Sequence, residues 1–197
     1  LQQPTVVFSS GNSTVADSSI TYATSDGGTT WTAKYEPEAG DTEGNVTFSV
    51  DFDDLAGNDG VDITAVIGSS SVLFDKTVPT LSSVSIASNN TPGPTTHAKV
   101  GHEVILSFTA SEAIKTNPTV VFQSGSAAIT NSGSITYANP SANNWTAKYT
   151  THSSDTAGAV TYSIDFDDLA ENDGTDVTSG SGSVTFDKTV PTLTGVS

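Results

Sequence analysis

The 197-residue sequence contains no cysteine and only six basic residues, all of them lysines, against 22 Asp and Glu. The lack of cysteine excludes a disulfide framework. The formal net charge of −16 disfavours nucleic acid and anionic membrane surfaces as partners, because like charges repel. No apolar run approaches the ~20 residues that a membrane span needs, and no signal-peptide pattern opens the sequence. We therefore expect neither nucleic-acid binding nor membrane insertion.

The sequence contains two copies of one module. The repeated motifs are PTVVF (4–8 and 118–122), SITY (19–22 and 134–137), WTAKY (31–35 and 145–149), DFDDLAGNDG/DFDDLAENDG (51–60 and 165–174) and FDKTVPTL (74–81 and 186–193). Each module has about a hundred residues, which is the size of an immunoglobulin-type sandwich.

The two copies differ in their opening segments. Residues 79–117 precede PTVVF in module two and have no counterpart ahead of it in module one, while 191–197 repeat only the opening of a module. The expected domains are a module that lacks its first two strands (1–78), a complete module (79–190) and the start of a further module (191–197). An excerpt from a long tandem array explains this pattern. The alternative is a subunit whose open groove takes a strand from another chain.

Apolar residues alternate with polar residues in short runs, as Val104, Leu106 and Phe108 do with Ser107 and Thr109. Across module two we expect strands at about 80–88, 103–110 and 119–123, short strands at Ile129 and at Ile135–Tyr137, and strands around Trp145–Tyr149, Val160–Phe166 and Val184–Phe186. About seven or eight short strands per complete module, without helical periodicity, predict an all-β fold of tandem immunoglobulin-like β-sandwiches.

Acidic side chains gather where one module is expected to meet the next. In an antiparallel sandwich, the hairpin 167–176, the loop that holds Glu112 and the exit of the previous module at 75–79 reach the same pole. Carboxylates held together repel one another unless a cation neutralises them, and calcium accepts six to eight oxygen ligands. The sequence therefore predicts a junctional calcium site with the ligands Asp75, Glu112, Asp167, Asp168, Asn172 and Asp173.

Other interpretations of these residues stay open. Asp168 and Asn172 flank a turn and can cap the hairpin backbone instead, and Asp165 and Asp167 can be solvated acids on an outward face. The segment does not match an EF-hand loop, because Leu169 stands where an oxygen ligand is needed. Module one lacks the preceding linker and a Glu112 equivalent, so its site is expected to be weaker or empty. The matching residues there are Asp53, Asp54, Asn58 and Asp59.

FTASEAI (108–114), the DLAGN-like turn (54–58 and 168–172) and the FDKTVPTL motifs resemble the tandem immunoglobulin-like repeats of large bacterial surface proteins and adhesins. The resemblance covers the whole chain. It implies an extracellular or cell-surface spacer, often with calcium near the linkers, that carries a terminal binding domain. The implied partners are neighbouring modules or identical subunits and, through other domains, a surface glycan or protein receptor. Lys76 lies inside the linker, and this lysine departs from the pattern of a junction that binds several calcium ions.

Catalysis has little support in the sequence. His97, His102 and His152 are scattered without metal-ligand spacing, and no serine lies in a nucleophile-elbow motif, so we expect no enzyme. Trp31 and Trp145 raise a second hypothesis, a carbohydrate-binding accessory module of a secreted protein, although core positions also explain them. We expect a structural spacer or stalk segment of an adhesin or fibre.

Overall fold

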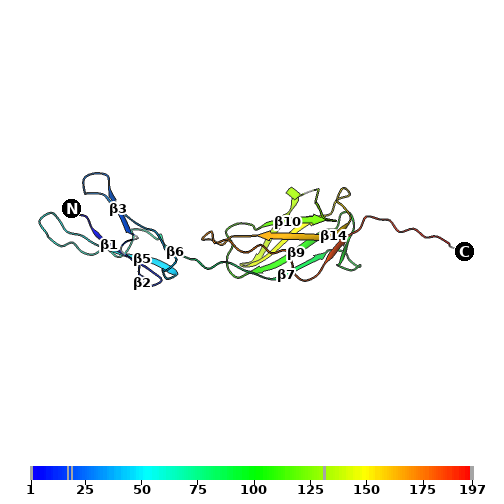
Figure 1. The fold of residues 1–197 in the computed structure, drawn as a ribbon, viewed down its shortest axis with the longest axis horizontal. Coiled ribbons are helices and arrows are strands. Elements are labelled where there is room, and N and C mark those ends of the chain that lie inside the picture. The colour runs from blue at the N-terminus through cyan, green and yellow to red at the C-terminus, as the bar shows by residue number, and fades with distance from the viewer. Residues whose placement is uncertain (1, 17, 19, 131, 196–197) are drawn as a thin grey trace. The chain divides into compact units, whose positions relative to one another are not determined.

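The computed structural model describes residues 2–16, 18, 20–130 and 132–195, and the chain divides into two compact units, Leu1–Lys76 and Thr77–Ser197. Both units are built from β-strands joined by loops (Figure 1). Within the described ranges, no helix has the length and hydropathy of a membrane span. Residues 196 and 197 of the expected third module lie outside the described residues.

Unit two is a sandwich of two sheets. Its strands are β7 (Leu81–Ser88), β8 (His97–Ala98), β9 (Glu103–Ala110), β10 (Thr119–Ser124), β11 (Ala127–Ala128), β12 (Thr136–Ser141), β13 (Asn144–Thr150), β14 (Gly158–Asp165) and β15 (Val184–Phe186). One sheet has the order β12-β13-β9-β7 and the other β11-β10-β14-β15-β8. If the longer strands are lettered A to G, A, B, E and D form one sheet and C, F and G the other, which is the immunoglobulin arrangement. The predicted fold class is confirmed.

β9 is an inner strand of its sheet, and its alternating side chains place one face in the core. It pairs antiparallel with β13 on one edge and with β7 on the other. Val104 and Leu106 are 0% exposed and Phe108 is 2% exposed, whereas the residues between them are half-buried. Full burial of such a side chain stabilises the fold by about 1.5–3 kcal/mol.

The region between β11 and β12 differs from the prediction. Ile129 is buried but lies in no strand, and β12 begins only at Thr136, after a short 3₁₀ turn, η2 (Ser132–Ser134). The backbone N–H of Thr130 donates to Oδ1 of Asp155 at 2.8 Å instead of to a neighbouring strand. The strand predicted at Ile129 is therefore wrong, since an apolar residue can be buried without strand pairing.

Unit one carries the same elements with a gap. Its strands are β1 (Thr5–Ser10), β2 (Ser13–Thr14), β3 (Ile20–Thr24), β4 (Trp31–Tyr35), β5 (Gly44–Asp51) and β6 (Val72–Phe74). The sheet β2-β1-β5-β6 matches β11-β10-β14-β15, and the pair β3-β4 matches β12-β13. Among the described residues of unit one, no strand corresponds to β7, β8 or β9 (Figure 1).

This gap leaves the core of unit one thin. Among its described residues, Val6 and Val15 are the buried apolar side chains. Val72 of β6 is 63% exposed, although its counterpart Val184 in unit two is 1% exposed. A domain that buries less of its apolar surface is correspondingly less stable.

Unit one should therefore unfold before unit two. The chain has two tryptophans, Trp31 in unit one and Trp145 in unit two, so Trp145→Phe and Trp31→Phe each leave one reporter. In urea, we expect the fluorescence of Trp31 to change at a lower concentration than that of Trp145. Superimposable transitions from the two reporters would contradict this.

The core of unit two should respond to truncation at β9. Leu106→Ala removes a fully buried side chain and should lower the free energy of unfolding, followed through Trp145, by about 2–5 kcal/mol. Val121→Ala is the control, because Val121 is 48% exposed and its truncation should cost less than about 0.5 kcal/mol. Equal effects of the two substitutions would argue against β9 as the centre of the core.

Candidate functional site

The hairpin after β14 is organised by the carboxylate of Asp168. Its Oδ1 accepts the backbone N–H groups of Ala170 at 2.7 Å and of Asn172 at 2.8 Å, and its Oδ2 accepts the side-chain amide of Asn172 at 2.7 Å. Asp168 is 1% exposed. The turn-capping role is therefore present, and it uses two of the six predicted calcium ligands.

Unit one repeats this turn contact for contact. Oδ1 of Asp54 accepts the N–H groups of Ala56 and Asn58, each at 2.8 Å, and Oδ2 accepts the Asn58 amide at 2.7 Å. The residue before the asparagine has positive φ in both turns, +81° at Gly57 and +71° at Glu171. Glycine adopts this backbone region without strain and glutamate does not, so the turn of unit one is the more relaxed copy.

The hydrogen bonds of the turn set the charge of its aspartate. Burial raises the pKa of Asp168, but the bonds from the Asn172 side chain and from backbone N–H groups outweigh burial and hold the pKa below its ordinary value. The pKa of Asp54 is also lowered, and the side-chain bond from Asn58 is the largest cause. Both carboxyls are consequently anionic at neutral pH.

The loop that holds Glu112 meets this hairpin within unit two. The N–H of Lys115 donates to the carbonyl of Asp167 at 2.9 Å, and Ile114 forms a β-bridge with Asp168. One carboxylate oxygen of Glu112 lies within 4.8 Å of one of Asp168. Antiparallel topology predicts this shared pole, and the resulting pair of close carboxylates favours a cation between them.

The other predicted ligands have different surroundings. Asp167 and Asp173 face each other across the hairpin as a β-bridge and are both exposed. Asn172 is half-buried and committed to the Asp168 turn. Asp75 belongs to unit one, where it follows β6 and is half-buried. The six-ligand calcium site stays a prediction.

A group of three carboxylates lies in unit one, and sequence reasoning selected only part of it. Asp51, Asp53 and Asp59 each offer an oxygen within 4.8 Å of the others. Asp51 ends β5, and Asp53 forms a β-bridge with Asp59 across the hairpin. The prediction for module one included Asp54, whose carboxylate caps its own turn, and omitted Asp51. The two-residue spacing of Asp51 and Asp53 in an extended chain was the available signal.

The lysine of FDKTVPTL has a structural role that the sequence did not reveal. Nζ of Lys76 donates to the carbonyl oxygens of Ala39 at 2.9 Å and Asp41 at 2.8 Å. Lys188 makes the same two contacts with the corresponding loop of unit two, at 3.1 and 2.8 Å. In each copy, the lysine connects the segment that follows β6 or β15 to the loop before β5 or β14.

The aromatic residues of WTAKY are core residues in unit two. Trp145 is 7% exposed and Tyr149 is 2% exposed, so neither can serve as an exposed sugar platform. In unit one, Trp31 is half-buried, and its indole N–H donates to the carbonyl of Gly28 at 3.2 Å. The core interpretation therefore holds for Trp145.

The Asp168 turn should stabilise unit two without any metal. In the presence of a chelator, Asp168→Ala removes three hydrogen bonds to a buried carboxylate and should lower the free energy of unfolding by about 2–3 kcal/mol in the Trp145 signal. Asp173→Ala, at an exposed position of the same hairpin, is the control and should cost less than about 0.5 kcal/mol. A similar loss from both substitutions would contradict the turn's role.

Acid should weaken the same turn. Because the pKa of Asp168 is lower in the folded state than in the unfolded state, its contribution is complete above the unfolded pKa of about 3.9 and is lost as pH falls toward the folded pKa. Urea unfolding of unit two between pH 6 and pH 2.5 should show this loss, and Asp168→Asn should show a smaller decline over that range. Identical pH profiles would count against it.

Comparison with known proteins does not identify a family for this chain. No protein-family model matches the chain, and no curated protein matches it. Among solved structures, the titin Ig tandem domains A164-A165 match with 14% sequence identity and a TM-score of 0.31, over 95% of this chain and 84% of that chain. The assignment to the immunoglobulin fold rests on the strand order of unit two.

Proposed function

We propose that the chain is a spacer segment of an extracellular tandem-repeat protein, an adhesin stalk or a fibre-forming appendage, in which calcium stiffens the junctions between modules. One observation carries the proposal. The two units repeat the same structural contacts, namely the aspartate turn and the lysine tie, at equivalent positions. An array of structural modules needs this kind of repetition, and the contacts repeated are ones that hold each unit together.

Calcium is supported by the charge pattern at the pole of unit two. Glu112 and Asp168 lie close together, and the chain carries a net charge of −16. The hydrogen bonds of the turn keep the Asp168 carboxylate ionised, which is the form that binds a cation. The turn also fixes this oxygen donor in place before an ion arrives.

A calcium ion at this position would limit bending of the linker, because the predicted ligands come from both sides of the unit boundary. Asp75 precedes the unit boundary, and the remaining ligands belong to unit two. An ion bound by both groups would restrict bending at the short linker, and binding only to the docked, folded state adds stability. The partners of such a segment are neighbouring modules or identical subunits, and a glycan or protein receptor is bound by other domains.

Calcium titration tests this proposal. Saturation at 100 times the dissociation constant should raise the free energy of unfolding by about 2.7 kcal/mol, and a chelator should increase chain flexibility in small-angle scattering. Glu112→Gln should abolish both effects. The control Glu171→Gln removes the same charge from the Lys115–Glu171 ion pair, outside the predicted ligands, and should preserve them. Absence of any calcium effect, or equal effects in the two variants, would refute the site.

A further inference from the structure

Unit one has an unpaired strand edge next to an open apolar groove. Within the described part of the chain, β4 pairs with β3 alone, whereas its counterpart β13 is paired on both edges, with β12 and with β9. The hydroxyl of Tyr22 on β3 accepts the N–H of Val6 on β1 at 2.9 Å, which connects the two sheets. The sheets therefore stay together while one edge of β4 is free.

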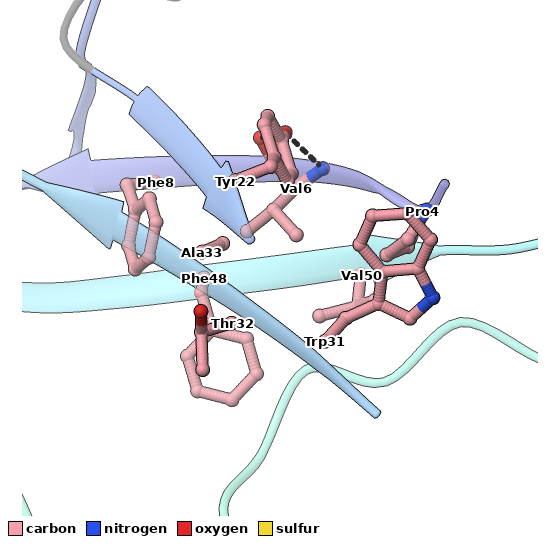
Figure 2. A pocket seen from close by; sticks show the side chains of 9 residues that line it. All are labelled: Pro4, Val6, Phe8, Tyr22, Trp31, Thr32, Ala33, Phe48 and Val50. Carbon is pink, nitrogen blue, oxygen red and sulfur yellow. Dashed lines mark hydrogen bonds between the residues drawn. The ribbon is translucent and has the colours of Figure 1, made fainter. Parts of the chain in front are cut away.

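The groove lies between these sheets and has a volume of about 320 Å³. Figure 2 shows side chains from β1, β3, β4 and β5 converging on it. We call it the unit-one groove, and its lining residues are Pro4, Val6, Phe8, Tyr22, Trp31, Thr32, Ala33, Phe48 and Val50. A second pocket of about 300 Å³ shares Pro4, Trp31 and Val50 with it, so the apolar surface continues toward Phe52 and Ile63.

Unit two shows what covers the equivalent surface. Trp145, Ala147 and Tyr149, the counterparts of Trp31, Ala33 and Tyr35, are 7%, 0% and 2% exposed there, while the unit-one residues are only half-buried. β9 lies beside them in a defined register, with Phe108 opposite Trp145, Leu106 opposite Ala147 and Val104 opposite Tyr149.

A second strand completes the cover in unit two. β7 pairs with the far edge of β9, and the loop between them contains β8, which pairs with β15. The counterpart of β15 in unit one is β6, whose Val72 and Leu73 are each 63% exposed. The surface that is exposed in unit one is thus the one that β7, β8 and β9 cover in unit two.

We propose that the unit-one groove binds a pair of β-strands of the chain's own repeat type, of which residues 79–117 are the copy carried by unit two. The incoming β9-type strand pairs antiparallel with the free edge of β4. Its valine, leucine and phenylalanine lie opposite Tyr35, Ala33 and Trp31 and fill the groove, and the β7-type strand closes the outer edge. This interaction is one of β-augmentation, and it does not depend on the calcium site.

A synthetic peptide of residues 79–117 tests the proposal. The peptide contains no tryptophan or tyrosine, so in the full chain with Trp145→Phe the emission comes from Trp31. Addition of the peptide should shift this emission to shorter wavelength with one-to-one saturation, and should move the unfolding of unit one to higher urea concentration. No spectral shift at peptide concentrations up to about 1 mM would overturn the proposal.

Two charge-matched peptides test the face that is used. Leu106→Asp places a charge on the side of β9 that is buried in unit two, and should weaken binding at least tenfold, which corresponds to about 1.4 kcal/mol. Ser107→Asp places the same charge on the opposite side, and its affinity should stay within about threefold. Equal affinities of the two peptides would show that the groove does not distinguish the two faces of the β9-type strand.

The competing occupant of the groove is a second copy of the chain, and the emission of Trp31 detects it as well. In sedimentation without peptide, the Trp145→Phe chain should remain monomeric. A concentration-dependent dimer in which Trp31 emission is already shifted, and which the peptide does not dissociate, would assign the groove to the folded surface of a second copy and overturn the proposal.

Discussion

The pairing of β9 with β13 and β7 is the interaction on which the closed sandwich depends. It connects β13 on one side of β9 with β7 on the other side. It also places Val104, Leu106 and Phe108 in the core between the two sheets. Each fully buried side chain of this kind stabilises the fold by about 1.5–3 kcal/mol, and a whole domain is stable by only about 5–15 kcal/mol. Loss of one such strand therefore removes a large share of the net stability. The two units of this chain display both cases, since the Trp, Ala and Tyr of WTAKY are buried where β9 is present and only half-buried where it has no counterpart.

The acidic turns illustrate how one residue can serve structure and charge together. Asp54 and Asp168 are held by the same set of hydrogen bonds, which lower their pKa and keep them ionised. A carboxylate fixed in this way loses little further freedom when it binds a cation, so a turn is a favourable starting point for a metal ligand. The hydrogen bonds exist without any ion, however, and an acidic motif is thereby explained by backbone geometry alone. The closeness of Glu112 to Asp168 is the feature that turn formation does not explain.

The sequence predicted the long strands well because alternation with period two is a direct consequence of one buried face. The expected strand at 103–110 coincides with β9, and the one at 80–88 differs from β7 by a single residue. Ile129 was placed in a strand wrongly, because apolar character reports burial and the Thr130–Asp155 bond that replaces pairing is a tertiary contact. The ties of Lys76 and Lys188 were missed for the same reason, since a lysine bound to carbonyls leaves no local pattern. At the candidate site, the antiparallel topology correctly predicted that the Glu112 loop meets the hairpin. The sequence could not distinguish predicted metal ligands from residues that cap the turn.

An open groove beside a free strand edge invites unspecific association, and the charge of the chain opposes it. An exposed strand edge presents unpaired N–H and C=O groups with which a second edge can pair. With a net charge of −16, copies of this chain repel one another over about 8–10 Å at physiological salt, whereas strand pairing acts only at contact. The segment 79–117 carries few charges, two lysines and two glutamates, and meets no comparable barrier. Electrostatics thus favours a nearly neutral strand pair over a whole acidic module as the occupant of the unit-one groove.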